Sequence, residues 1–262
     1  MTTPTVLVTH PREGVALVTI NRPQQYNAID PATDAAMGQA LAQLEQDASV
    51  RCIVITGAGD KAFCAGADIP TLLPHLAANI AAGRDDPQFC GVTHRHATTR
   101  PLIAAINGVA FGGGLELALA CDIRLASDGA RMGLPEIKVG VIAAAGGVTR
   151  LPYALPQALA AEMILSGEPI SAARALQAGL VSRVVPHAQL LDEALALAAA
   201  IAQRAPLAVR ACTALLRQPR FDGLRPALER ERAAFGELLA SDDAREGIRS
   251  FAEKRNPLWR GA

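Results

Sequence analysis

The sequence predicts an α/β fold with mainly parallel strands, for three reasons. Half of the 262 residues are hydrophobic and only 19% are charged, so the chain can bury one sizeable core. Short β-branched runs recur along the chain, and glycine-rich turns and helical segments separate them. That alternation is typical of parallel sheets covered by helices. We therefore expect one main domain with room for a small appendage.

The first expected elements are two strands and a helix. β-Type runs span residues 5–9 and 15–20, and residues 10–14 between them favour a hairpin turn. Asp30 then precedes Pro31, the pattern of an N-cap followed by the first helical position. Apolar residues follow at helical spacing, which predicts a helix with one buried face.

The middle of the chain repeats the order strand, glycine turn and helix. Cys52–Thr56 is a continuous apolar, β-branched run, typical of a strand buried on both faces. A glycine-rich loop and a helix from about Asp68 follow, and residues 79–100 are polar and irregular. The next expected elements are a strand at 102–106, a helix at 115–120 and a strand at 123–126.

From about Ala188 the pattern becomes entirely helical. Segments 224–239 and 241–254 are expected to be amphipathic helices, the second with Ser241 as its N-cap. We divide the chain into a core at residues 1–200 and a helical C-terminal region at residues 201–262. This region is expected to dock on the core or on a neighbouring subunit.

Charge and cysteine content exclude several classes of protein. Basic and acidic side chains both number 25, so no net field favours nucleic acid or an anionic membrane. The five cysteines are scattered and odd in number, which predicts no disulfide framework and fits a reducing cytoplasm. We expect neither a secretory signal nor a membrane span. His94 and His96 have no acidic or cysteine cluster beside them, so a solvated segment is favoured over a metal site.

Several enzyme motifs are missing or incomplete. P-loop and nucleophile-elbow patterns do not occur in the sequence. Residues 57–62 resemble the glycine turn of a dinucleotide site. The strand and acid expected about 20 residues later are missing, so this match is weak.

Two glycine-rich turns ahead of predicted helices give a stronger signal. They span Ala62–Ile69 and Asn107–Gly114. Small residues leave main-chain N–H groups approachable, and each helix N-terminus adds unpaired donors and partial positive charge. Either turn alone fits an ordinary tight turn. Two donors aimed at one point would form an oxyanion hole, in which loss of one donor costs about 3–4 kcal/mol of barrier.

Two glutamates accompany these turns. Glu116 lies in the first turn of an apolar helix, either as a carboxylate favoured by the helix dipole or as a buried group suited to proton transfer. Glu136 follows a short strand in an expected loop, where it fits a solvated acid. Either glutamate alone favours a structural role.

Read together, these residues resemble the crotonase superfamily, also called the enoyl-CoA hydratase/isomerase family. The resemblance covers nearly the whole chain, and its motifs fall in the family's order and spacing. They are Asn21-Arg22-Pro23, Asn27-Ala28, Ala65-Gly66-Ala67-Asp68, Gly112–Leu117, Cys121-Asp122, Pro135-Glu136, Ala145-Gly146-Gly147 with Arg150-Leu151, Ala178–Val181 with Val184-Val185, and Phe251–Pro257.

The resemblance implies a spiral core of ββα units with a helical C-terminal trimerisation region. Trimers of this family often pair as hexamers. The implied substrate is an acyl-CoA thioester, with no metal or redox cofactor, because coenzyme A enters as part of the substrate. The N–H groups of Ala67 and Gly113 would form the oxyanion hole. Further residues expected at the CoA ester are Ala65, Asp68, Ile69, Gly112 and Gly114.

The implied reaction is reversible syn addition of water to a trans-2-enoyl-CoA, which gives a 3-hydroxyacyl-CoA. Glu116 would hold the water and take its proton, and Glu136 would supply a proton to C2. Two positions depart from the family. Pro70 stands where many members have a lysine near CoA, and residues 142–145 replace a proline-containing stretch near Glu136, which could reshape the acyl pocket.

Other activities remain open within this resemblance. An isomerase typically relies on one acid, at the Glu136 position, whereas two glutamates favour hydration or the reverse dehydration, including dehydration of the carnitinyl-CoA type. RNA-binding members use a lysine-rich helix, and this chain has only three lysines. A catalytically silent member would lack a glutamate or a glycine turn, and the sequence keeps all of them.

Overall fold

The computed structural model describes residues 3–83, 89–93, 99–204, 206–217, 229, 232, 236 and 239–255. Its larger sheet has six strands in the order β1-β2-β3-β5-β7-β10. These strands are β1 (Val6–Arg12), β2 (Val15–Ile20), β3 (Cys52–Gly57), β5 (Leu102–Ile106), β7 (Ile123–Ser127) and β10 (Arg183–Val185). Only the β1–β2 pair of this sheet is antiparallel, and the other four pairs are parallel. The expected α/β fold with mainly parallel strands is confirmed.

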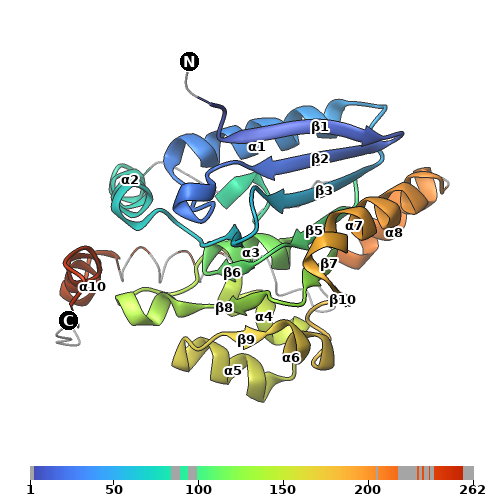
Figure 1. Cartoon of the computed structure of the whole chain (residues 1–262). Helices are drawn as coiled ribbons and strands as arrows, with labels where there is room; N and C mark the ends of the chain where they lie inside the picture. The colour runs from blue at the N-terminus through green and yellow to red at the C-terminus, as the bar shows by residue number, and fades with distance from the viewer. Residues whose placement is uncertain are drawn as a thin grey trace.

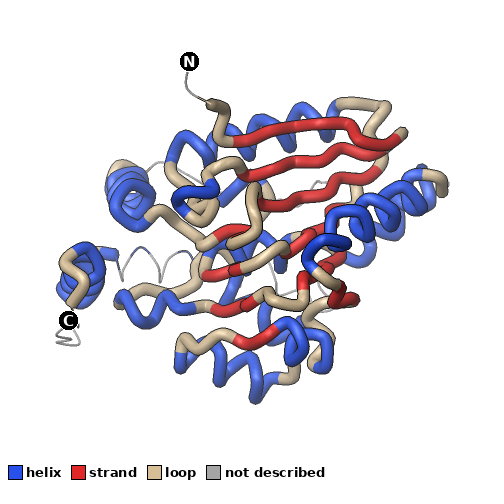
Figure 2. Tube along the Cα trace, viewed as in Figure 1, coloured by secondary structure: helices blue, strands red, loops and turns tan. Residues whose placement is uncertain are grey.

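A second, smaller sheet has the order β4-β6-β8-β9 (Figure 2, strands in red). Its strands are β4 (Ala62–Cys64), β6 (Val109–Phe111), β8 (Arg131–Gly133) and β9 (Ile170–Ser171). Each of β3, β5 and β7 in the large sheet is followed by a short strand in the small sheet. Helix α2 (Ile69–Ala81) follows β4, and α3 (Gly113–Ala120) follows β6. This repetition is the spiral of ββα units that the family resemblance implied.

Helices cover both faces of the large sheet (Figure 1). Ile53 and Ile55 of β3 pack in the cluster that contains α1 and α3, whereas Cys52 and Val54 pack in the cluster that contains α7. The predicted burial of this strand on both faces is therefore confirmed. The remaining helical segments are η1 (Pro23–Gln25), α1 (Pro31–Gln46), η2 (Phe89–Gly91), η3 (Pro135–Val139), α4 (Gly147–Ala154), α5 (Gln157–Ser166), α6 (Ala172–Gln177), α7 (His187–Ala202), α8 (Pro206–Arg217) and α10 (Asp242–Ala252).

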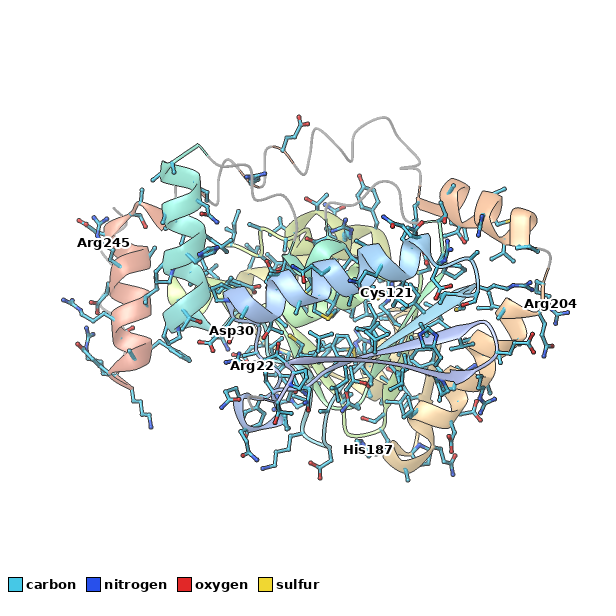
Figure 3. The ribbon with its side chains drawn as sticks, turned by 90° about the horizontal axis from the view of Figure 1, so that it is seen from above. Arg22, Asp30, Cys121, His187, Arg204 and Arg245 are labelled. Atoms are coloured by element: carbon cyan, nitrogen blue, oxygen red, sulfur yellow. The ribbon has the colours of Figure 1, made fainter. Side chains whose placement is uncertain are left out.

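The C-terminal helices lie at two ends of the molecule (Figures 1 and 3). Arg217 of α8 bonds the Asp122 carboxylate at 2.5 and 2.7 Å, which ties this helix to the core. Helix α10 lies beside α2 at the other end, and Ser241 accepts the N-cap hydrogen bond that the sequence predicted. Most of the predicted helix at 224–239 lies outside the described residues. In the part of the chain that the structure describes, no helix is long and apolar enough to span a membrane.

Three local expectations differ from the structure. Strand β1 continues through Pro11 to Arg12, with a register shift after Thr9, because an irregular pairing accommodates a residue that has no N–H. Helix α3 begins at Gly113, two residues early, and α2 continues to Ala81. His94 and His96 lie outside the described residues.

Candidate active site

A cavity of about 700 Å³ lies between the two glycine turns, η3, α2 and α10. Side chains from α2 give it an apolar wall, formed by Leu72, Leu73, Leu76 and Ile80. Ala67, Gly113, Glu116 and Glu136 all line this one cavity. The structure therefore brings together the four residues on which the sequence-based mechanism depends.

The first turn directs the Ala67 N–H away from its neighbouring strand segment. Ile29 and Ala67 form a parallel bridge, in which the Ile29 N–H donates to Gly66 O and the Asp68 N–H donates to Ile29 O, both at 2.8 Å. In such a bridge the groups of the flanking residues face the partner. The N–H of Ala67 itself thus points away from Ile29, and Ala67 lines the cavity.

The motif at residues 21–28 holds this turn in place. The Arg22 guanidinium contacts the carboxylates of Asp68 at 3.0 Å and Asp30 at 3.1 Å, and Figure 3 shows Arg22 and Asp30 close together beside α1. Asn27 is fully buried, donates to Ala62 O at 2.7 Å and accepts from the Arg22 N–H at 3.0 Å. The motif therefore holds the first turn at both ends, at Ala62 through Asn27 and at Asp68 through Arg22.

The second turn meets the first one through glycine contacts. Gly113 is the first residue of α3, so the helix offers no partner for its N–H. A Cβ on Gly66 would lie 2.8 Å from Phe111 O and 3.2 Å from Gly113 N. This approach requires glycine and brings the residue before Ala67 against the Gly113 amide.

Glu116 is buried, with 4% of its surface exposed. The N–H of Gly147 donates to its Oε1 at 2.8 Å. Gly147 is the first residue of α4, so the positive end of a helix faces this carboxylate. Glycine at position 147 allows this close approach, because a Cβ on Gly147 would lie 2.9 Å from the same oxygen.

Glu136 lies in the 3-10 helix η3 and not in the expected loop. Pro135 starts this helix, and proline at a first helical position was the signal that could have revealed it. A Cβ on Gly112 would lie 3.0 Å from Glu136 Oε1. The carboxylate therefore lies against the turn that carries the Gly113 amide.

The other predicted contact residues divide into two groups. Ala65, Asp68, Ile69 and Gly112 line the cavity, and so do Pro70 and residues 142, 144 and 145. Gly114 is not among the lining residues. A Cβ there would lie 2.0 Å from Cys64 O, so Gly114 permits close packing behind the turn. Burial raises the pKa of the Cys64 thiol to about 12, which keeps it protonated at neutral pH.

Several further residues line the cavity although no sequence signal placed them there. Asp34 and Phe89 line the cavity from α1 and η2, and Arg232 and Arg255 line it from the C-terminal region. Arg255 belongs to the family-like closing segment, and the hydrogen bonds that its guanidinium donates to the Glu246 and Glu253 carboxylates raise its pKa. Among the described residues, no group of three or more His, Cys, Asp and Glu side chains could hold a metal ion.

A family comparison decides which enzymes this arrangement belongs with. The enoyl-CoA hydratase/isomerase family model matches residues 10–262. The chain belongs to this family. The (E)-benzylidenesuccinyl-CoA hydratase of Thauera aromatica is 42% identical over 248 residues, with 95% of this chain and 96% of the relative covered. The carnitinyl-CoA dehydratase of Salmonella paratyphi A is 40% identical over 255 residues, with 95% and 97% covered.

The fold agrees with solved members of the enoyl-CoA hydratase/isomerase family. The crystal structure of a carnitinyl-CoA hydratase from Mycobacterium avium is 43% identical and superposes with a TM-score of 0.88 over 100% of both chains. The crotonase-type architecture is therefore confirmed. The family match and the named relatives together support a hydro-lyase that acts on CoA thioesters.

Proposed function

We propose that this protein is an enoyl-CoA hydratase that adds water reversibly and syn to a trans-2-enoyl-CoA. The observation that carries the proposal is the convergence of Ala67, Gly113, Glu116 and Glu136 on one cavity. The two amides hold the thioester oxygen as it takes on enolate charge, and preorganised donors of this kind can contribute several kcal/mol. The acyl-CoA substrate brings its own coenzyme A, and the protein assembles as a homotrimer or as a homohexamer of two trimers.

Glu116 acts as the general base in this proposal. Water is a poor nucleophile, so a carboxylate must hold it and take its proton while its oxygen bonds to C3. The hydrogen bond from the first N–H of α4 fixes one carboxylate oxygen of Glu116. A helix N-terminus also stabilises negative charge, which favours the ionised form that a base needs.

Glu136 supplies the proton to C2 in the same proposal. Its carboxylate lies against Gly112, next to the amide that holds the thioester oxygen. The α-carbon next to that thioester takes on carbanion character as the enolate forms. A proton from Glu136 at C2 then completes the 3-hydroxyacyl-CoA, and the reverse sequence removes water.

Dehydration of a carnitinyl-CoA-type substrate is the second candidate. A carnitinyl-CoA dehydratase is 40% identical to this chain, and a carnitinyl-CoA hydratase of known structure is 43% identical. The same two glutamates serve this direction, because loss of water from C2 and C3 is the reverse of its addition. A panel that includes crotonyl-CoA and carnitinyl-CoA distinguishes the two candidates by their kcat/KM values.

The mutations Glu116→Gln and Glu136→Gln test the proposal. Each change keeps the size of the side chain and removes its acid–base chemistry, so kcat for crotonyl-CoA hydration should fall about 10²–10⁴-fold. Loss of the enoyl absorbance measures the rate, and calorimetric binding of butanoyl-CoA should remain intact. Full activity in either variant would remove the proposed acid–base pair. The exposed Glu162 lies outside the cavity, and Glu162→Gln is the matched control.

A further inference from the structure

The ring of Phe89 lies directly beside the proposed oxyanion amide. A Cβ on Gly113 would lie 2.5 Å from Phe89 Cζ and 2.8 Å from Cε1, so the tip of the ring points at the first residue of α3. Phe89 also lines the cavity. The ring therefore occupies space next to the atom that binds the thioester oxygen in the proposed function.

A constrained turn fixes the position of this ring. Cys90 adopts a left-handed conformation, with φ 54° and ψ 23°, which is uncommon for a residue other than glycine. Gly91 follows at φ +69°, and a Cβ there would lie 2.6 Å from Gly38 Cα of α1. Such backbone strain persists only where surrounding structure enforces it, and it is frequent at ligand sites.

Hydrogen bonds complete the support for the turn. The Cys90 N–H donates to Asp34 Oδ1 at 2.5 Å, and the Phe89 N–H donates to Thr93 Oγ1 at 3.1 Å. The Arg150 guanidinium donates in turn to Thr93 O and, at 3.2 Å, to Ala145 O. Asp34 and Ala145 themselves line the cavity. The support of the ring is thus part of the cavity wall.

We propose that Phe89 determines acyl specificity by limiting the width of the acyl group beside the thioester carbonyl, with Asp34 as the positioning residue that holds its turn. This inference rests on the proposed function, which places the carbonyl oxygen at Gly113. A substituent on C2 is the part of the acyl group nearest that carbonyl. A branched acyl group must therefore compete with the ring for space, whereas a linear one does not.

Calorimetric binding of two saturated esters to the full-length protein tests this assignment without any turnover. The probes are butanoyl-CoA and 2-methylbutanoyl-CoA, which differ by one methyl group at C2. One such group can change discrimination about 10–200-fold in a shaped pocket. Wild type should bind the linear ester at least about tenfold more tightly, and Phe89→Ala should reduce that ratio to about threefold or less. Phe89→Leu leaves an apolar side chain of intermediate size and should give an intermediate ratio.

The role of Asp34 is tested in the same assay. Asp34→Ala removes the acceptor for the Cys90 N–H and should lower the selectivity ratio as Phe89→Ala does. Asp34→Asn keeps an acceptor oxygen and should restore the wild-type ratio, which a general loss of stability would not do. Tyr153 is exposed and outside the cavity, so Tyr153→Ala is the control for loss of an aromatic ring.

Three results would contradict the inference. An unchanged ratio in both Phe89 variants would overturn the role of Phe89 and leave the hydratase proposal standing. Equal loss of selectivity in Asp34→Ala and Asp34→Asn would overturn the role of Asp34. Failure of wild type to bind either ester would overturn the proposed function, and the assignment of Phe89 with it.

Discussion

Arg22 is the residue on which the geometry of the first turn depends. Its guanidinium contacts both Asp68, the N-cap of α2, and Asp30, the N-cap of α1. All three side chains are at most 23% exposed. One cation therefore links two helix starts to the turn that carries Ala67.

Asp30 should stabilise the fold in a pH-dependent way. Partial burial raises the pKa of Asp30, but hydrogen bonds from Thr33 and the charge of Arg22 outweigh this effect, so its pKa falls below 3.8. A depressed pKa contributes stability that is present above the unfolded value and is lost as pH falls through the folded value. Asp30→Ala should lower the free energy of unfolding by about 1–2 kcal/mol at pH 7.

Urea denaturation at pH 7 and near pH 3 measures this effect. The difference between wild type and Asp30→Ala should shrink at the lower pH, because the Asp30 carboxylate then binds protons more readily in the unfolded chain than in the folded one. Asp30→Asn keeps an N-cap acceptor and loses the charge, so at pH 7 it should be less destabilised than the alanine variant. A pH-independent difference would contradict a role for the charge of Asp30 in stability.

The three consecutive glycines at 112–114 show which contacts of single residues the sequence could not predict. Three consecutive glycines predicted a close approach to the main chain, and the structure gives each glycine a different neighbour. Glu136 lies at Gly112, the Phe89 ring at Gly113 and the Cys64 carbonyl at Gly114. Of these three contacts, only the one at Gly114 joins the two glycine-rich turns to each other. These partners come from distant segments, so no local pattern could assign them.

At the scale of elements, the regular strands and helix starts were predictable from local patterns. The strand β5 and the N-caps Asp30 and Ser241 lie where periodicity and capping placed them. Segment η2 was not predictable, because its turn depends on Asp34 and on contact with Gly38 of α1. The polar sequence around it gave no periodic signal. Its position over the cavity is a consequence of tertiary packing.

Helix α10 shows a similar limit. The capping pattern predicted where this helix begins, but the sequence did not decide whether it packs on the core or on another subunit. In the structure it packs on η3, where a Cβ on Gly247 would lie 2.1 Å from Val139 O. The helix thereby supports the segment that carries Glu136, and Phe251 and Arg255 line the cavity. The division into residues 1–200 and 201–262 stays a prediction.

At the scale of the whole molecule, we expect a trimer or a hexamer. The mass of one chain is 27.3 kDa, and zero net charge gives little repulsion between copies. Exposed apolar side chains include Leu165, Leu176 and Leu216. Light scattering should report a mass three or six times that of one chain, whereas particles of only 27.3 kDa would contradict the expected assembly.

A crystal structure of the protein with acetoacetyl-CoA bound tests the central claim most directly. We predict a thioester oxygen about 2.7–3.1 Å from the nitrogens of both Ala67 and Gly113, with the Glu116 and Glu136 carboxylates facing C2 and C3. A thioester that binds outside this cavity, or an oxygen that reaches neither amide, would contradict the proposed mechanism.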